Sequence, residues 1–236
     1  MHFLLTNDDG IDAPGLAALE AAVRSLPGAQ ITVVAPDGER SMCGHRVTTH
    51  QPIILEHRGD ARHVINAMPA DCVRVALFAL GVKPDVVISG VNAGGNMGQD
   101  LVISGTVAAA REAAYHGLPA IALSHYLIKG VPLDWERVSA WTAEILRELL
   151  QQPLGDGEFW NVNLPHPGSE ISALPERLLV PPAREPLPVG YESETDAAGR
   201  TLLRYNVHYA DRPAPPQTDV GVCFGGCVAV SRLRVT

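Results

Sequence analysis

The chain has 236 residues, 46% of them hydrophobic and 19% charged, so it can bury a core and does not have the composition of a disordered chain. Its 18 basic and 26 acidic residues give a net charge of −8, which excludes the basic field of proteins that bind polymeric nucleic acid. The chain has no apolar run of about 18 residues, and its apolar start at His2 lacks the basic leader of an export signal. We therefore expect a cytoplasmic protein with no membrane association and no nucleic-acid polymer as partner.

The first half of the chain alternates strand-like and helix-like segments, which is typical of parallel strands joined by helical crossovers. The predicted strands are 3–7, 31–35, 85–89 and 121–124, and the predicted helices are 16–26, 73–80, 104–116 and 135–150. Ser104 can cap the third of these helices, alanines fill it, and Gly117 stops it. The pattern predicts an α/β fold with a mostly parallel sheet.

The composition changes after Gln151. Prolines cluster at 181–182, 186–188 and 213–216, and the strand-like runs 159–164, 202–209 and 228–230 are separated by long loops. We therefore predict a catalytic core over 1–151, and a C-terminal segment over 152–236 that contributes strands to the core and an oligomerisation arm. Segments of this kind often pack against a neighbouring subunit.

Two adjacent carboxylates follow the first predicted strand, in the run Asn7-Asp8-Asp9-Gly10. In open parallel sheets, ligands bind outside the carboxyl ends of the strands. Where a strand ends and turns, neighbouring carboxylates can converge on one hard cation. A turn with two solvated carboxylates is the alternative, since short acidic turns are common. The position of the pair favours the metal site.

Two further polar loops follow strand ends on the same edge. The loop 36–41 ends at Ser41, which can offer a neutral oxygen ligand, although its residues are ordinary for a loop. The loop 89–98 combines glycines, which let backbone amides approach an anion, with Asn92 and Asn96. A flexible loop is the alternative, and the absence of the Walker and dinucleotide-binding spacings disfavours an NTPase or a dehydrogenase.

The best-defined helix opens with Ser104-Gly105-Thr106. This start offers backbone amides, hydroxyls and the positive end of the helix dipole to a phosphate, although Ser104 could also serve only as a cap. Together with the carboxylate pair and the two polar loops, the helix start predicts a pocket for a metal ion and a phosphate.

At these residues the sequence closely resembles the SurE family of survival-protein nucleotidases, over most of the chain. The family's Asn-Asp-Asp-Gly and Ala-Pro-Gly are present at 7–10 and 13–15, its Ala-Pro-Asp and Arg-Ser at 35–37 and 40–41, and its Ser-Gly-Asn-rich block followed by Ser-Gly-Thr-Val-Ala-Ala-Ala at 89–110. The resemblance implies a Rossmann-like core of three layers, with a β-rich C-terminal extension exchanged between subunits. A homodimer or homotetramer is therefore expected.

The resemblance also implies a divalent-metal-dependent phosphomonoesterase that hydrolyses nucleoside monophosphates to nucleoside and phosphate, a 5′/3′-nucleotidase. One Mg²⁺ or Mn²⁺ per subunit would be held by residues at the positions of the family's metal ligands: Asp8, Asp9, Ser41 and Asn92. The residues that match the family's phosphate side are Asn96, Ser104, Gly105 and Thr106. The catalytic residues expected on this basis are Asp8, Asp9, Asn96 and Ser104. A broad acid phosphatase or exopolyphosphatase is the alternative, followed by a non-catalytic nucleotide-binding regulatory protein.

Some residues depart from the family pattern. Met42 replaces the glycine that usually follows the serine of the second loop, and Ile103 stands where a tyrosine is common. These changes predict differences in loop flexibility and base stacking more than in reaction class. Attack on phosphorus by water and direct attack by Asp8 both stay open as routes. His45, near the serine loop, could contact the substrate, but a lone histidine in a loop is more often solvated, and solvation is the expectation here.

Overall fold

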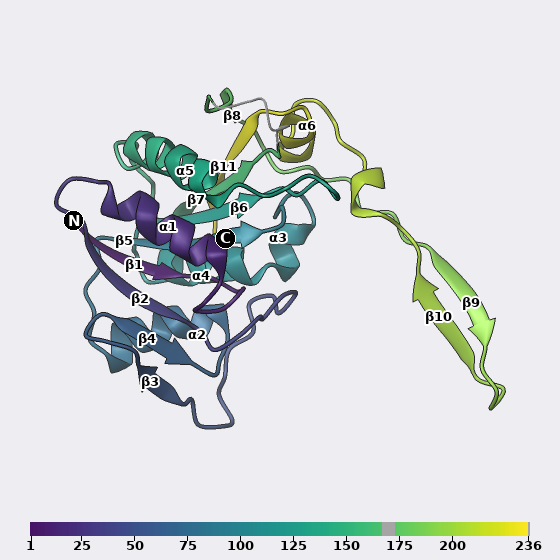
Figure 1. The fold of residues 1–236 in the computed structure, drawn as a ribbon, viewed down its shortest axis with the longest axis horizontal. Coiled ribbons are helices and arrows are strands. Elements are labelled where there is room, and N and C mark those ends of the chain that lie inside the picture. Colours follow the sequence, from purple (N-terminus) through teal and green to yellow (C-terminus); the bar gives the residue numbers. More distant parts are fainter. Residues whose placement is uncertain (167–172, 236) are drawn as a thin grey trace.

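The computed structural model describes residues 1–166 and 173–235, which form one nine-stranded sheet between two layers of helices and a two-stranded arm that projects from this body (Figure 1). The strand order in the large sheet is β3-β4-β2-β1-β5-β6-β7-β11-β8. The predicted α/β class with a mostly parallel sheet is confirmed.

The elements have the following bounds. The strands of the large sheet are β1 (His2–Thr6), β2 (Gln30–Pro36), β3 (Leu55–His57), β4 (Arg62–Ile65), β5 (Val86–Ala93), β6 (Ala120–His125), β7 (Glu158–Leu164), β8 (Arg177–Leu179) and β11 (Val228–Arg234). The α-helices are α1 (Pro14–Arg24), α2 (Pro69–Arg74), α3 (Asp100–Ile103), α4 (Gly105–Tyr115), α5 (Trp135–Leu149) and α6 (Asp219–Phe224). A π-helical turn spans Val75–Ala79, and a 3-10 turn spans Tyr209–Asp211.

The centre of the sheet is parallel. Strand β1 lies between β2 and β5, so that Leu4 is opposite Thr32 on one side and Val87 on the other. Strands β4, β6 and β7 continue the parallel arrangement, whereas β3 and β11 run antiparallel to β4 and β7. Because the central strands share one direction, the loops that leave β1, β2 and β5 emerge at the same edge of the sheet.

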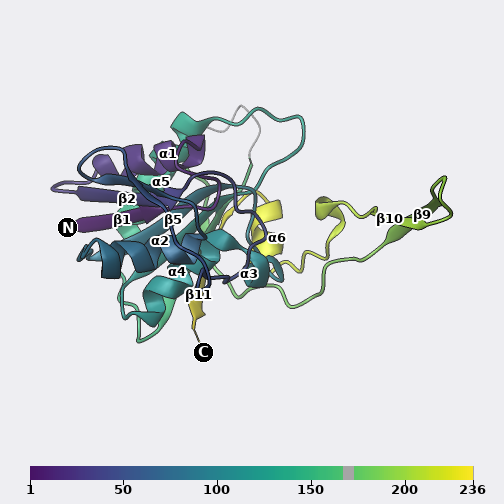
Figure 2. The ribbon, with the colours of Figure 1, turned by 90° about the horizontal axis from the view of Figure 1, so that it is seen from below.

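Helices cover both faces of the sheet, as Figure 2 shows from below. On one face α1 packs against α5, and both bury leucines and isoleucine such as Leu16, Leu19 and Ile145. On the other face α2 packs against α4, whose buried residues are mostly alanines. Small side chains let α4 lie close to the sheet and bring its first turn to the end of β1.

The structure corrects several predicted elements. The helix predicted over 73–80 begins at Pro69 and changes to a π-helical turn, closed by the bond from Leu80 N–H to the Val75 carbonyl at 2.9 Å. The strand predicted over 202–209 ends at Tyr205. Strands β3 and β4 were not predicted, so the segment 85–89 belongs to the fourth parallel strand rather than the third.

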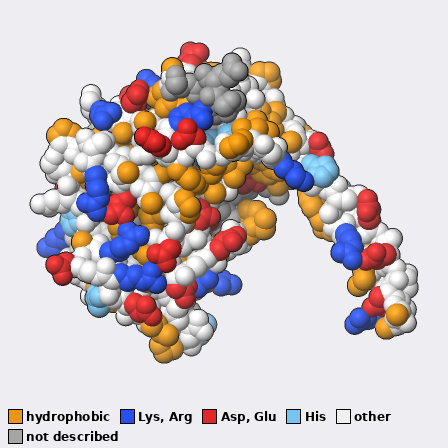
Figure 3. Space-filling view, viewed as in Figure 1, with side chains coloured by type: hydrophobic (Ala, Val, Ile, Leu, Met, Phe, Trp, Pro, Cys, Tyr) orange, Lys and Arg blue, Asp and Glu red, His pale blue; other side chains and the backbone are white. Residues whose placement is uncertain are grey.

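The C-terminal segment contributes to both the body and the arm. Strands β7, β8 and β11 complete the large sheet, whereas β9 (Tyr191–Thr195) and β10 (Thr201–Tyr205) pair only with each other. All ten residues of this hairpin are exposed, and hydrophobic side chains gather where the arm leaves the body (Figure 3). The boundary at residue 151 stays a prediction. In the described ranges, no helix has the length and apolar character needed to cross a membrane.

Candidate active site

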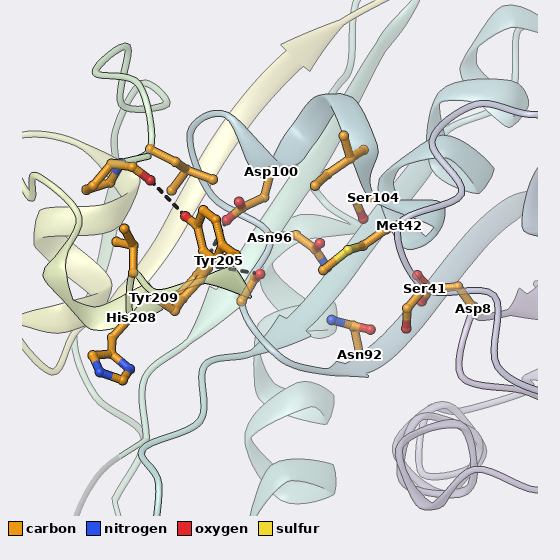
Figure 4. A pocket seen from close by; sticks show the side chains of 15 residues that line it. Asp8, Ser41, Met42, Asn92, Asn96, Asp100, Ser104, Tyr205, His208 and Tyr209 are labelled. Carbon is orange, nitrogen blue, oxygen red and sulfur yellow. Dashed lines mark hydrogen bonds between the residues drawn. The ribbon is translucent and has the colours of Figure 1, made fainter. Parts of the chain in front are cut away.

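A pocket of about 510 Å³ opens where the loops after β1, β2 and β5 meet the root of the arm (Figure 4). Its lining falls into two chemical halves. Polar side chains from the body form one end: Asp8, Ser41, Asn92, Asn96 and Ser104, whereas Asp100 lies beside Tyr209. Mostly apolar and aromatic residues of the arm root form the other: Leu187, Pro188, Tyr205, Val207, His208 and Tyr209. Met42, Gly95 and Ile103 complete the lining.

The turn after β1 is fixed by its own side chains. The Asn7 amide donates to the Gly10 carbonyl at 2.8 Å, which bends the chain directly after the strand. Gly10 has a φ of +105°, and a Cβ there would lie 3.0 Å from the Cα of Gly38 in the loop after β2. The turn and the neighbouring loop therefore fit together only with glycine at position 10, and this contact sets where Asp8 and Asp9 stand.

Asp8 is buried beneath the pocket, with 4% of its surface exposed. Burial raises the pKa of its carboxyl from 3.8 to about 6, even though the hydroxyl of Thr106 donates a hydrogen bond to it, and the charge of Asp9 raises it further. A carboxylate in this position is costly unless a positive charge lies beside it.

Asp9 is half-buried, and burial also raises its pKa, with a further contribution from the charge of Glu39. The backbone N–H of Ala93, at the end of β5, donates to its Oδ2 at 3.1 Å. Within residues 1–166 and 173–235, neither Asp8 nor Asp9 forms an ion pair with a basic side chain. The two adjacent carboxylates therefore form an uncompensated negative site.

Two neutral oxygen donors complete the set predicted for a metal. The Ser41 hydroxyl donates to Glu39 Oε1 at 2.7 Å, and its lone pairs stay available. The pairing of β5 with β6 shifts register between Ser89 and Asn92, which changes the direction of the strand before Asn92. The side-chain N–H of Asn92 donates to the Gly94 carbonyl at 2.7 Å, so the side-chain oxygen is the atom that can act as a metal ligand. Ser41 and Asn92 line the pocket with Asp8, as Figure 4 shows.

All four donors are oxygens, which suits a hard cation such as Mg²⁺ or Mn²⁺. Only two of them are acidic; among the described residues, no cluster of three or more His, Cys, Asp or Glu could hold a metal ion.

Asn96 is held from several directions. Its amide Nδ2 donates to Ser124 Oγ at 2.7 Å, its backbone N–H donates to Asn163 Oδ1 at 2.8 Å, and its carbonyl accepts from Asn161 and Asn163 at 3.0 Å each. These partners come from β6 and β7, deep in the sheet. An amide fixed in this way is preorganised to meet a ligand in the pocket.

The first turn of α4 lies against the carboxylate of Asp8. Ser104 both lines the pocket and caps the helix, because its Oγ accepts from Val107 N–H at 3.1 Å. A Cβ on Gly105 would lie 2.8 Å from the Cβ of Asp8, so only glycine fits there. Gly105 and Thr106 are buried, and both the hydroxyl and the backbone of Thr106 form hydrogen bonds with the Asp8 carboxylate.

Sequence reasoning missed the residues that tie the arm to the glycine-rich loop. Arg212 Nη1 forms an ion pair with Asp100 Oδ2 at 2.5 Å, and its Nη2 donates to the Met97 carbonyl at 3.0 Å. The Tyr209 hydroxyl donates to the same Asp100 oxygen at 2.8 Å, and the Arg212 guanidinium stacks 4.8 Å above the Tyr209 ring. These contacts join segments about 110 positions apart, for which the sequence carries no local signal.

The expectation that His45 is solvated is wrong. Its Nε2 lies 2.7 Å from Oε2 of Glu112, a buried residue of α4 that also pairs with Arg74 at 2.6 Å and His116 at 3.0 Å. Burial alone would raise the pKa of Glu112, but the hydrogen bonds from His45 and Arg74 outweigh it and lower that pKa to about 2. His45 thus fastens the segment after Ser41 to α4 and does not line the pocket.

Comparison with known proteins gives a consistent result. The profile of the family described as "Survival protein SurE" matches residues 3–177. A putative 5′-nucleotidase of Nostoc sp. is 47% identical, with all of both chains covered, and the 5′-nucleotidase SurE of Cereibacter sphaeroides is 38% identical over 99% of this chain and 94% of its own. The crystal structure of a SurE protein from Aquifex aeolicus superposes with a TM-score of 0.88 at 28% identity, covering 100% of this chain and 94% of its own.

Proposed function

The chain belongs to the SurE family, and on this premise we propose that it is a 5′-nucleotidase, which hydrolyses nucleoside monophosphates to nucleoside and phosphate. The observation that carries the proposal is the division of the pocket into two chemical halves. An oxygen-rich, negatively charged end suits a cation with a phosphate, and an aromatic end suits the nucleoside of the same ester.

The aromatic end favours a nucleotide over polyphosphate. Tyr205 and Tyr209 line it together with Ile103, and these side chains can pack against a sugar and a base. None of the described residues that line the pocket is a lysine or arginine, which a chain of phosphates would need for charge compensation. A broad acid phosphatase or exopolyphosphatase is therefore the weaker alternative.

We further propose that activity depends on one divalent cation per subunit, held by Asp8, Asp9, Ser41 and Asn92. The fit rests on the uncompensated carboxylate pair and on the all-oxygen donor set. When bound, such a cation supplies Lewis-acid polarisation of a phosphate oxygen and of water. Its charge would also offset the burial cost of the Asp8 carboxylate.

The remaining polar residues are proposed to bind and orient the phosphate. The side-chain amide of Asn96, which is held by Ser124 of β6, offers a donor in a fixed position. Ser104 and the backbone amides of Gly105 and Thr106 would contact the other oxygens at the positive end of α4. Cleavage of 3′ esters is proposed at the same site.

We also propose that the protein is cytoplasmic and forms a homodimer or homotetramer. The four cysteines are free thiols, a state that is compatible with a reducing compartment. The hairpin β9–β10 exposes Tyr191 and Leu203, and an arm of this kind gains stability by packing on a second copy. Size-exclusion chromatography with light scattering measures the molar mass in solution and thereby tests whether the protein is a dimer or a tetramer.

The proposed activity is tested by phosphate release from 5′- and 3′-nucleoside monophosphates, using chelator-treated protein with and without Mg²⁺ or Mn²⁺. Polyphosphate and an aryl phosphate serve as competing substrates. We expect release from nucleotides that requires metal and falls at least 100-fold in Asp9→Ala, because one of the two acidic donors is lost. Asp12→Ala, at an exposed carboxylate three positions away, is the matched control.

Either of two results would contradict the proposal. Absence of release from every nucleotide with every metal would favour a non-catalytic binding protein. Faster release from polyphosphate than from nucleotides would favour the exopolyphosphatase alternative.

A further inference from the structure

Met42 has an unfavourable backbone conformation beside the pocket. Among the described residues it is the one non-glycine residue with a positive φ, at +56°. This left-handed region is disfavoured for every residue with a Cβ and is comfortable for glycine. Met42 is also 81% exposed although its side chain is apolar. The position is therefore unfavourable both for the backbone and for the side chain.

The loop that carries Met42 is fixed on both sides, so its conformation is imposed. The backbone N–H of Arg40 donates to the Asp8 carbonyl at 2.7 Å, and the N–H of Gly44 donates to the Ile103 carbonyl at 2.8 Å. Between these anchors the chain has to turn at Met42. Non-glycine residues in this region concentrate where a side chain is needed for function.

The side chain of Met42 lines the same pocket as the proposed substrate-binding residues. In Figure 4 it extends from the Ser41 side of the view towards Asn96, and its sulfur lies between their labels. The same lining includes Ile103, which is 42% exposed, and the aromatic residues of the arm root. The thioether therefore extends over the polar residues in the direction of Asn96, and the tyrosines of the arm lie beyond Asn96 in the same view.

We propose that Met42 contacts the leaving group of the substrate and favours esters that carry an aromatic base over esters that do not. The proposal rests on the proposed nucleotidase function. A flexible, polarisable thioether packs against the edges and faces of aromatic rings and adapts to rings of different size. Met42 would accordingly select for the presence of a base and discriminate weakly among bases. Met42 is a specificity-determining residue, and phosphate binding at the polar end of the site does not require it.

The test compares kcat/KM for a nucleoside 5′-monophosphate and for ribose 5-phosphate, which has the same phosphate and sugar but no base. In Met42→Gly, we expect the ratio of the two values to fall about three- to tenfold, the range of a sulfur–aromatic contact. Met42→Leu keeps an apolar side chain but loses the sulfur, so it should lower the ratio by less than Met42→Gly does. Ile54→Gly, at an exposed apolar residue outside the pocket, should leave the ratio unchanged.

Thermal unfolding of the same variants separates a contact role from a folding role. Because glycine relieves the positive φ, Met42→Gly should unfold about 2–4 °C above wild type, so that a lower ratio occurs in a more stable protein. An unchanged ratio in Met42→Gly, or an equal fall of both kcat/KM values, would overturn the proposal. If wild type hydrolyses neither ester, the nucleotidase function itself fails, and this result is distinct because it does not depend on any variant.

Discussion

Asp8→Asn should stabilise the metal-free protein near neutral pH. Burial holds the pKa of Asp8 at about 6 in the folded chain, against 3.8 when the carboxyl is free in water. Each tenfold change in acidity corresponds to about 1.4 kcal/mol, so the ionised carboxylate lowers the free energy of unfolding by about 3 kcal/mol above pH 6. Asparagine cannot ionise, and its oxygen can still accept the hydrogen bond from Thr106.

The sign of the pH dependence follows from the raised pKa. Between pH 4 and pH 6 the folded chain keeps the proton on Asp8 while the unfolded chain has lost it, so the stability of wild type falls as pH rises through this window. The difference in unfolding free energy between Asp8→Asn and wild type should therefore be close to zero at pH 4 and about 3 kcal/mol at pH 7.

Urea unfolding in chelator at pH 4, 5, 6 and 7 measures this difference. Asp12→Asn, where the side chain is 78% exposed, is the matched control and should change stability by less than about 0.5 kcal/mol. Added Mg²⁺ or Mn²⁺ should stabilise wild type and not Asp8→Asn. A variant no more stable than wild type at pH 7, or a gain that is equally large at pH 4, would refute the reasoning.

Two further variants probe how the site is held. Gly105→Ala would bring its Cβ to 2.8 Å from the Cβ of Asp8, so we expect kcat/KM for nucleotides to fall at least tenfold, whereas Gly38→Ala, with open space around its Cβ, should change it less than twofold. Arg212→Met removes the ion-pair partner of the buried Asp100 carboxylate and should lower the free energy of unfolding by about 3 kcal/mol. Adding Asp100→Asn to this variant should restore part of that loss, as measured by urea titration. If the effects of the two substitutions simply add, the two residues are not coupled.

The sequence was sufficient to predict the parallel core because buried strands and amphipathic helices alternate at regular intervals. It failed for strands β3 and β4, whose residues include His57, Arg62 and His63 and resemble a polar loop. It also failed for β9, where the run Tyr191–Thr195 has no buried position that would create an alternating pattern. In both cases pairing with a neighbouring strand, rather than local propensity, determines the structure.

The polar end of the candidate site was predictable because each of its loops follows a strand end, and parallel strands bring their carboxyl ends together. The aromatic end was not, because Tyr205 and Tyr209 reach the pocket only through the path of the C-terminal arm. Composition could indicate that 152–236 differs from the core. It could not indicate that Arg212 meets Asp100, since this contact depends on the folded arm.

The single carboxylate of Glu112 makes the effects of substitutions at four positions depend on one another. His45, Arg74 and His116 all bond to it, so any one of them can change while the others still have a partner. Loss of Glu112 itself would leave three basic side chains facing each other around a buried position. Substitution at position 112 should therefore cost more stability while these three neighbours are present than after they have been replaced, so the order in which such mutations arise matters.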